Sequence, residues 1–314
     1  MKILVVGGAG YVGGAVTDIL KKNNLDFTVY DNLLYESQFL KKCDFIFGDV
    51  RDYKKLNKIL PDFDCVIWIA ALVGDGACSI NPQITADINL ASIKNLIENF
   101  NGRIIFFSTC SVYGAQHGVL DENSKLNPLS QYAITKLKAE QLLKDKNSII
   151  FRLGTLFGLS DTYSRIRMDL VVNTLTARAL FENKINIFGG EQYRPLLHVR
   201  DAARAIVESI DKKNVGIFNL SLKNYKIIDI AKIVRNYFPK LEMNLTEIPF
   251  QDARNYKVDN KKSYEELNFK AEISVETGVS EVKELLEKKR IKDINDPRYT
   301  NQKYLELFTN KINL

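Results

Sequence analysis

The sequence predicts an α/β protein, with a doubly wound parallel sheet and a smaller mixed α/β domain toward the C-terminus. Short apolar runs rich in β-branched residues alternate with amphipathic stretches through residues 1–153, as in strands buried on both faces. The first of these runs leads directly into a glycine-rich turn and a helix. After residue 153 the alternation is less regular, which indicates a second architecture in the C-terminal part.

The first strand, expected at residues 2–6, is followed at 7–14 by the turn Gly-Gly-Ala-Gly-Tyr-Val-Gly-Gly. Gly7 permits a tight turn, Gly10 lets the backbone approach a pyrophosphate, and Gly13 lets the helix pack against the strand. The helix N-terminus offers unpaired N–H groups and a positive dipole end to phosphates. This predicts a Rossmann-type dinucleotide-binding fold. The expected contacts are Gly7, Gly10, Tyr11 and Val12.

The second strand, expected at residues 27–30, ends in Asp31. An acid at this distance from the glycine turn accepts hydrogen bonds from both ribose hydroxyls of a dinucleotide. Its charge also repels a 2′-phosphate. The sequence therefore predicts NAD, rather than NADP, as the cofactor.

Further cofactor contacts are expected where the next two strands, at residues 45–47 and 65–69, end. A carboxylate there can contact the adenine amino group or cap the helix expected at 53–60. Small side chains allow the cofactor to pass close to the backbone. The positions expected to contact the cofactor are Asn32, Asp49, Val50, Ala70 and Ala71.

A long amphipathic helix is expected from Pro82 to Phe100, and a strand at 103–107 follows it. That strand delivers the sequence Ser-Thr-Cys-Ser-Val-Tyr-Gly to its carboxyl end, where ligands bind in open α/β sheets. The next helix begins near Gln131 and places Tyr132 and Lys136 four residues apart, on one face.

The order of these motifs resembles the extended short-chain dehydrogenase/reductase family, in its sugar-nucleotide epimerase/dehydratase branch. The resemblance covers nearly the whole chain and rests on GGAGYVG, GDVRD, STCSVYG, YAITK and RPLLHVRD. It implies that Thr109 is the catalytic hydroxyl, Tyr132 the base and Lys136 the catalytic lysine.

The chemistry of these three groups agrees with those roles. A free phenol has a pKa near ~10, too high for a base at neutral pH. A neighbouring ammonium and the positive nicotinamide both favour the phenolate, so Tyr132 can remove a hydroxyl proton while hydride leaves for NAD. Thr109 would orient the same oxygen, and Lys136 would also hold the nicotinamide ribose.

The resemblance implies a nucleoside diphosphate sugar as substrate and a homodimer formed through helices at 84–100 and 129–144. In the family, the arginine of the RPLLHVRD segment contacts a phosphate, and it corresponds to Arg194. Thr155 stands where the family usually has asparagine, and Pro249 where it has a second arginine, a contact that Arg254 could take over. The expected substrate contacts are Ser111, Thr155, Asn173, Arg194 and Arg254.

We expect an interleaved division of the chain. Residues 1–155, with about 185–220, would form the NAD-binding domain, and 156–184 with 221–314 the sugar-nucleotide-binding domain. The stretch from 292 to 314 is polar with scattered apolar residues, and we expect it to pack loosely.

Several reactions begin with oxidation at sugar C4. A 4,6-dehydratase would need Asp-Glu after Thr109, where this chain has Cys110-Ser111. A 3,5-epimerase-reductase like GDP-fucose synthase would need cysteine at position 111. Two outcomes stay open: 4-epimerisation, or 4-dehydrogenation to a keto sugar, either of them in surface-polysaccharide sugar biosynthesis. The alternatives are a sugar-nucleotide 4-keto reductase, a steroid- or flavonoid-type reductase, and a non-catalytic NAD-binding regulator.

Composition excludes several classes of protein. Apolar residues make up 46% and charged residues 26% of the chain, and the net charge of +6 comes from scattered lysines. Neither nucleic acid nor membrane is therefore an expected partner, and no apolar run reaches transmembrane length. Four cysteines without paired spacing indicate reduced thiols and a cytoplasmic location, and two histidines leave little room for a metal centre, so none is expected.

Overall fold

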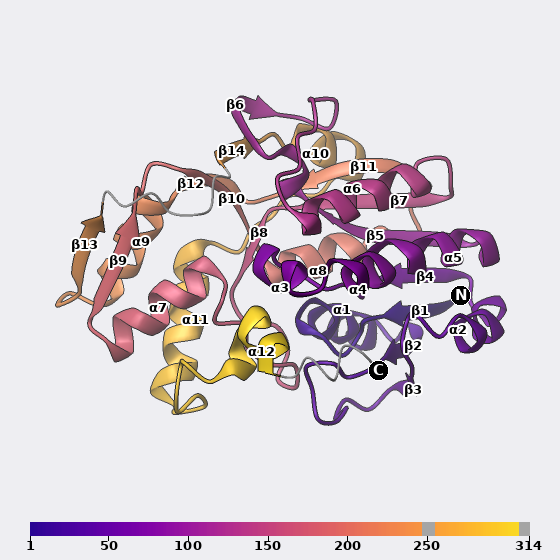
Figure 1. Cartoon of the computed structure of the whole chain (residues 1–314), viewed down its shortest axis with the longest axis horizontal. Coiled ribbons are helices and arrows are strands. Elements are labelled where there is room, and N and C mark those ends of the chain that lie inside the picture. Colours follow the sequence, from indigo (N-terminus) through magenta and orange to yellow (C-terminus); the bar gives the residue numbers. More distant parts are fainter. Residues whose placement is uncertain (247–254, 308–314) are drawn as a thin grey trace.

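The centre of the protein is a parallel sheet of seven strands (Figure 1), seen in a computed structural model that describes residues 1–246 and 255–307. The strand order is β11-β7-β5-β4-β1-β2-β3, and every neighbouring pair is parallel. The order reverses between β1 and β4, which confirms the doubly wound, Rossmann-type prediction. The strands are β1 (Lys2–Val6), β2 (Asp26–Asp31), β3 (Asp44–Phe47), β4 (Cys65–Trp68), β5 (Arg103–Thr109), β7 (Ser148–Leu153) and β11 (Gly216–Leu220).

Helices cover both faces of this sheet, which explains why its strands are continuously apolar. In β1, Ile3 and Val5 join the core on one face, while Leu4 and Val6 join the core on the other. The first core contains α1 (Tyr11–Lys22) and α8 (Val199–Val207); the second contains α2 (Tyr53–Ile59), α5 (Ser92–Asn99) and α6 (Gln131–Leu143).

The long helix expected from Pro82 is interrupted by a π-helical turn, Asp87–Ala91, between α4 (Pro82–Ala86) and α5. Asn89, in this turn, accepts a hydrogen bond from the Leu72 N–H at 2.8 Å and donates one to the Leu72 carbonyl at 2.9 Å. Its buried amide therefore satisfies the backbone just beyond β4, beside the short helix α3 (Asp75–Ile80).

The smaller part of the protein has mixed strands and its own core, as predicted, and lies to the left of the central sheet in Figure 1. In its three-stranded sheet, β10 pairs parallel with β8 and antiparallel with β12. The elements of this part are β8 (Thr155–Phe157), α7 (Val171–Phe181), β9 (Lys184–Phe188), β10 (Tyr193–His198), β12 (Lys223–Lys226), α9 (Ile227–Tyr237), β13 (Glu242–Thr246) and α11 (Val275–Glu287). A separate pair joins β6 (Ala115–Leu120) to β14 (Asn255–Val258), with α10 (Lys261–Leu267) after it.

The division of the chain into two domains stays a prediction. Strand pairing indicates more closely where the chain crosses from one domain to the other. Within 185–220, α8 and β11 belong to the layers of the central sheet. In the same range, β9 pairs with β13, and β10 pairs with β8 and β12, all outside that sheet. We propose that the crossing between the domains lies at α8.

The expectation of a loosely packed C-terminal stretch is wrong for residues 297–305. A 3₁₀ turn, Pro297–Tyr299, leads into α12 (Asn301–Leu307), and the side chains of Tyr304 and Leu305 are buried in the second core. Across residues 1–246 and 255–307, no helix combines the length and apolar character required to cross a bilayer.

Candidate active site

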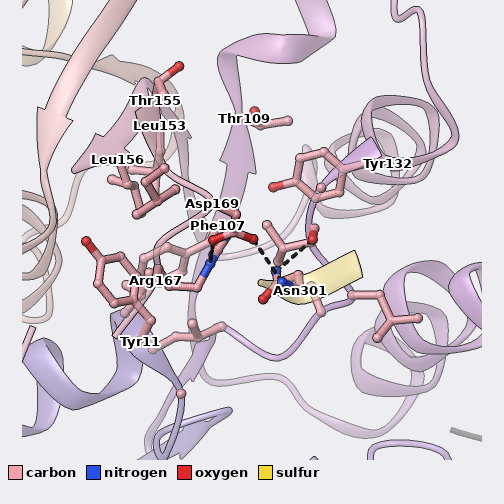
Figure 2. A pocket seen from close by; sticks show the side chains of 18 of the residues that line it. Tyr11, Phe107, Thr109, Tyr132, Leu153, Thr155, Leu156, Arg167, Asp169 and Asn301 are labelled. Carbon is pink, nitrogen blue, oxygen red and sulfur yellow. Dashed lines mark hydrogen bonds and ion pairs between the residues drawn. The ribbon is translucent and has the colours of Figure 1, made fainter. Parts of the chain in front are cut away.

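A cavity of about 660 Å³ lies where β1, β2, β4 and β5 end, at the reversal of strand order, and Figure 2 shows its interior. Ligands of doubly wound sheets bind at this place. The cavity is lined by most of the residues predicted for the site: Gly7, Gly10, Tyr11, Val12, Asp31, Asn32, Asp49, Val50, Ala70, Ala71, Thr109, Ser111, Tyr132, Lys136, Thr155 and Arg194.

The glycine turn brings backbone close to backbone on one side of this cavity. Gly7 has φ +87°, and a Cβ there would lie 2.5 Å from the Ala70 nitrogen. A Cβ on Gly13 would lie 2.3 Å from the Gly7 carbonyl oxygen. At Gly10, by contrast, only the Gly7 oxygen at 3.6 Å is near, so the side of the turn that faces the cavity stays open.

Asp31 places a half-buried carboxylate at the cavity wall. It accepts hydrogen bonds from the Ala9 N–H at 3.0 Å and the Leu33 N–H at 2.8 Å. Burial raises the pKa of Asp31, and these two backbone donors offset only part of that rise. The carboxylate, the turn without side chains and the cavity between them fit a dinucleotide.

Asp49 lines the cavity beside Asn32, but Arg51 and Asn32 already bind its carboxylate, each at 2.9 Å. Burial acts to raise the pKa of Asp49, yet the hydrogen bonds from Arg51 outweigh it and leave that pKa lowered. The cap of the following helix is Asp52, which accepts from the Lys55 N–H at 3.0 Å.

The three predicted catalytic side chains face one space. Thr109 ends β5, while Tyr132 and Lys136 come from the first turns of α6, which Ser130 caps. Figure 2 shows the Tyr132 hydroxyl and Thr109 at the same end of the cavity. Burial raises the pKa of Tyr132, and hydrogen bonding with Thr109 acts to lower it. Burial is the larger effect, so the net shift in the pKa of Tyr132 is upward.

Lys136 is held rigidly beside the end of β5. Its ammonium donates to the Phe107 carbonyl at 2.7 Å and lies 4.6 Å from the centre of the Phe106 ring. Burial lowers the pKa of Lys136 to about 8, against the charges of Cys78 and Glu140, which raise it. Lys136 is therefore poised to lose its charge closer to neutral pH than an exposed lysine.

A buried ion pair that the sequence analysis missed anchors α6 one turn beyond Lys136. Arg152 and Glu140 pair at 2.7 Å with both side chains buried, and Ser108 donates to the same carboxylate. Because Ser108 precedes Thr109 on β5, this contact fixes the helix against the strand that carries the threonine. No spacing pattern joins these three positions, so they could not be found from the sequence.

The end of the cavity expected to hold the substrate contains Ser111, Thr155 and Arg194. Arg194 is buried and donates to the Tyr193 carbonyl at 2.8 Å. Asn173 is not part of the cavity lining: its buried amide binds the N–H and carbonyl of Gly158 and the Arg167 carbonyl. Arg254 lies outside the described residues.

Another part of the cavity wall is built from segments far apart in the sequence, and the sequence analysis missed it. We use the name roof for residues 33–36, 73, 165–169 and 297–305. We use the name floor for the cavity-lining residues within 7–14, 31, 70–71, 109 and 132–136. The roof places Tyr35, Arg165, Arg167, Asp169 and Asn301 in the lining. The two arginines and Asp169 at 165–169 were a possible signal, whereas nothing in the sequence marks Asn301.

Over residues 1–246 and 255–307, no group of three or more His, Cys, Asp or Glu side chains could hold a metal ion.

Comparison with known proteins extends these observations. The family described as "NAD dependent epimerase/dehydratase family" matches residues 3–221. An N-acetyl-α-D-glucosaminyl-diphospho-ditrans,octacis-undecaprenol 4-epimerase of Escherichia coli O157:H7 is 32% identical over 261 residues, covering 78% of this chain and 70% of that protein. A UDP-glucuronate 4-epimerase of Thermodesulfobacterium geofontis is 28% identical over 307 residues, covering 88% and 93%.

Among solved structures, the UDP-glucose 4-epimerase of Thermotoga maritima with UDP-glucose superposes with a TM-score of 0.82 at 24% identity, covering 93% of this chain and 100% of that one. At this identity the likeness shows the fold alone. The family match covers more than half of the chain, and it agrees with the strand order, the glycine turn and the Thr-Tyr-Lys cluster. The chain therefore belongs to the NAD-dependent epimerase/dehydratase family and is an enzyme that uses NAD.

Proposed function

We propose that this enzyme oxidises C4 of a nucleoside diphosphate sugar, as a 4-epimerase or as a 4-dehydrogenase that releases a 4-keto sugar. One observation carries the proposal: the glycine turn, Asp31, the three residues Thr109, Tyr132 and Lys136, and Arg194 all line a single cavity. A sugar nucleotide in this cavity can therefore meet both a guanidinium suited to its diphosphate and the phenol that takes the hydroxyl proton.

The chain's own residues divide the work of the reaction. Bound NAD supplies the carbon that accepts and returns a hydride. Tyr132 takes the proton from the sugar hydroxyl at its phenolic oxygen, and Thr109 hydrogen-bonds the same sugar oxygen to fix its direction. Lys136 stabilises the phenolate with its positive charge, from a position set by the Phe107 carbonyl.

The substrate class is supported by the relatives. The two epimerases named above act on a UDP-sugar and on a sugar diphosphate linked to a lipid. A CDP-paratose 2-epimerase of Salmonella typhi is 24% identical over 333 residues. We therefore propose a pyrimidine nucleotide sugar, with UDP-sugars first, in the biosynthesis of a surface polysaccharide.

Epimerisation is favoured over release of a keto sugar because both of those closer relatives are named 4-epimerases. The dehydratase alternative lacks its acid pair, because Cys110 and Ser111 occupy the two positions after Thr109. Cys110 is fully buried, and its thiol donates to the Arg152 carbonyl. A 4-keto reductase would use the same three residues in the opposite direction.

The test is incubation of the purified enzyme with NAD and a panel of UDP-, CDP-, dTDP- and GDP-sugars, followed by mass spectrometry and NMR. An isomer of unchanged mass establishes the epimerase, and a product lighter by two hydrogens with NADH establishes the dehydrogenase. If NAD binds and no sugar nucleotide in the panel turns over, the proposed substrate class is wrong.

We also propose that the enzyme is a homodimer, with α4, α5 and α6 at the interface. Light scattering combined with gel filtration tests this. A monomer mass at micromolar concentration would contradict it.

A further inference from the structure

The roof carries an arginine that the proposed chemistry does not use. Arg167 lines the cavity, its side chain is only 11% exposed, and it forms a two-point ion pair with Asp169, through Nε at 2.6 Å and Nη2 at 3.0 Å. Within residues 1–246 and 255–307, no acceptor is hydrogen-bonded to the remaining nitrogen, Nη1. A fixed guanidinium with donors to spare suits a phosphate oxygen.

The position of Arg167 also suits a phosphate. Its guanidinium lies 5.9 Å from the centre of the Tyr11 ring, and Tyr11 is the first residue of α1, whose N-terminus follows the glycine turn. In Figure 2, Arg167 lies between Tyr11 and Tyr132. An anion between Arg167 and the start of α1 would meet the guanidinium on one side and the positive helix end on the other.

The C-terminal segment holds Arg167 in place through its ion-pair partner. The Asn301 N–H donates to the Asp169 carboxylate at 2.9 Å, and the Asn301 side chain donates to the Val73 carbonyl at 2.8 Å. Asn301 also accepts from Arg165, whose guanidinium stacks 4.0 Å from the Tyr35 ring. Residues 297–305 thus connect three separate strips of the cavity wall.

Two further contacts make this connection a strap. The Met168 N–H donates to the Tyr299 carbonyl at 2.8 Å, and Arg165 donates to the Arg298 carbonyl at 2.9 Å. The buried Tyr35 hydroxyl has no hydrogen-bond partner among the described residues, which leaves a second donor at the same wall.

We propose that Arg167 binds the diphosphate of a ligand lying between it and the N-terminus of α1, and that residues 297–305 hold Arg167 there through Asp169 and Asn301. The diphosphate is that of the dinucleotide or that of the sugar nucleotide, both of which this cavity would admit. The inference rests on NAD as the cofactor and does not depend on C4 as the site of reaction.

The experiment measures the dissociation constants of NAD and of UDP separately, by calorimetry, on wild-type protein and four variants. Arg167→Gln removes the charge and, because one charge-assisted hydrogen bond is lost, should weaken one of the two ligands by about tenfold or more. Weaker NAD binding assigns the dinucleotide diphosphate, and weaker UDP binding assigns the sugar-nucleotide one. Unchanged affinity for both ligands overturns the proposal.

Asn301→Ala keeps Arg167 and Asp169 but removes the side-chain links of the strap. It should weaken the same ligand by a smaller factor, and unchanged binding would overturn the role of the strap. Lys303→Ala is the matched control, because Lys303 lies on the same helix with an exposed side chain, and it should leave both constants unchanged.

Thermal melting separates binding from folding. If Arg167→Gln does not fold, Arg167→Lys decides: a several-fold weaker ligand supports the proposal, whereas wild-type affinities with a lower melting temperature mean that Arg167 serves only Asp169. If wild-type protein does not bind UDP, the NAD measurements decide alone. Failure of the proposed C4 reaction leaves those NAD measurements intact.

Discussion

The floor and the roof of the cavity are held together in different ways. Floor residues sit at the ends of regular strands and at the start of helices, and apolar cores on both faces of the sheet fix those ends. Roof residues sit in irregular segments joined by ion pairs and hydrogen bonds, such as those between Asp169 and Asn301. The catalytic side chains thus depend on strand and helix ends fixed by apolar packing, whereas the roof side chains that line the cavity depend on polar contacts with one another.

The largest expected effect tests whether the floor alone carries the chemistry. Tyr132→Phe should lower turnover by about 10²–10⁴-fold, the usual contribution of a positioned acid–base group. NAD should still bind, since the floor keeps its shape, and calorimetry checks this. Tyr163→Phe, at an exposed tyrosine, is the control. Turnover above a tenth of the wild-type rate in the Tyr132 variant would contradict the assignment.

The next test asks whether the roof unfolds together with the apolar core that supports the floor. Leu96 and Leu305 are both fully buried and belong to the same core, but Leu96 lies on α5 and Leu305 on the C-terminal helix. Leu96→Ala should lower the free energy of unfolding by about 2–5 kcal/mol. Leu305→Ala should lower it by less, because the strap can detach locally. Urea denaturation measures both, and equal losses would mean that the roof is as cooperative as the floor.

A smaller effect is expected at Asp31, whose half-buried charge lowers the free energy of unfolding in the absence of cofactor. Its raised pKa means that the folded chain holds the proton to higher pH than the unfolded chain. Stability therefore falls as pH rises from the ordinary carboxyl pKa through the folded value, and stays lowered above it. Asp31→Asn cannot ionise, so it should melt at a higher temperature than wild type at pH 7 in the absence of NAD.

The same variant should bind NAD about tenfold more weakly, because a charge-assisted hydrogen bond to ribose is lost. Its preference for NAD over NADP should also decrease. Calorimetry with both dinucleotides checks this. An unchanged preference would mean that another group selects the cofactor.

The smallest effect is the pH dependence that Lys136 contributes. Burial lowers its pKa from 10.5 to about 8, so between these values the unfolded chain binds more protons than the folded one. Stability contributed by this group therefore rises with pH from about 8 to 10.5. Urea unfolding of wild type and Lys136→Met across this pH range should show the free energy of unfolding of the wild type rising relative to that of the variant. If the difference in the free energy of unfolding does not change with pH, the pKa of Lys136 is not lowered by burial.

The contrast between floor and roof also explains what the sequence could predict. The strands of the parallel sheet, the glycine turn and the Tyr132–Lys136 pair follow from patterns within short windows of the sequence. Asn301 and Asp169 are separated by 132 residues, and their contact leaves no periodic trace. The C-terminal stretch looked loose because its apolar residues are scattered among polar ones; Tyr304 and Leu305 nevertheless enter the second core, and Ile294 and Tyr299 pack against a separate cluster.

Two smaller differences have the same origin. The π-helical turn at Asp87–Ala91 could not be predicted, because the apolar spacing of the helix continues on both sides of it. In this turn, Asn89 accepts a hydrogen bond from the backbone N–H of Leu72. Asn173 looked like a ligand contact, but its amide is used by backbone groups of Gly158 and Arg167. In both cases a polar side chain satisfies distant backbone, which spacing cannot reveal.

The position of the strap in the chain has a consequence for synthesis. All seven strands of the central sheet, ending at Leu220, leave the ribosome before residues 297–305 do. A growing chain can therefore complete its nucleotide-binding edge while that edge is still uncovered. We expect a dinucleotide to enter most easily at this stage, so that the order of translation helps to load the enzyme.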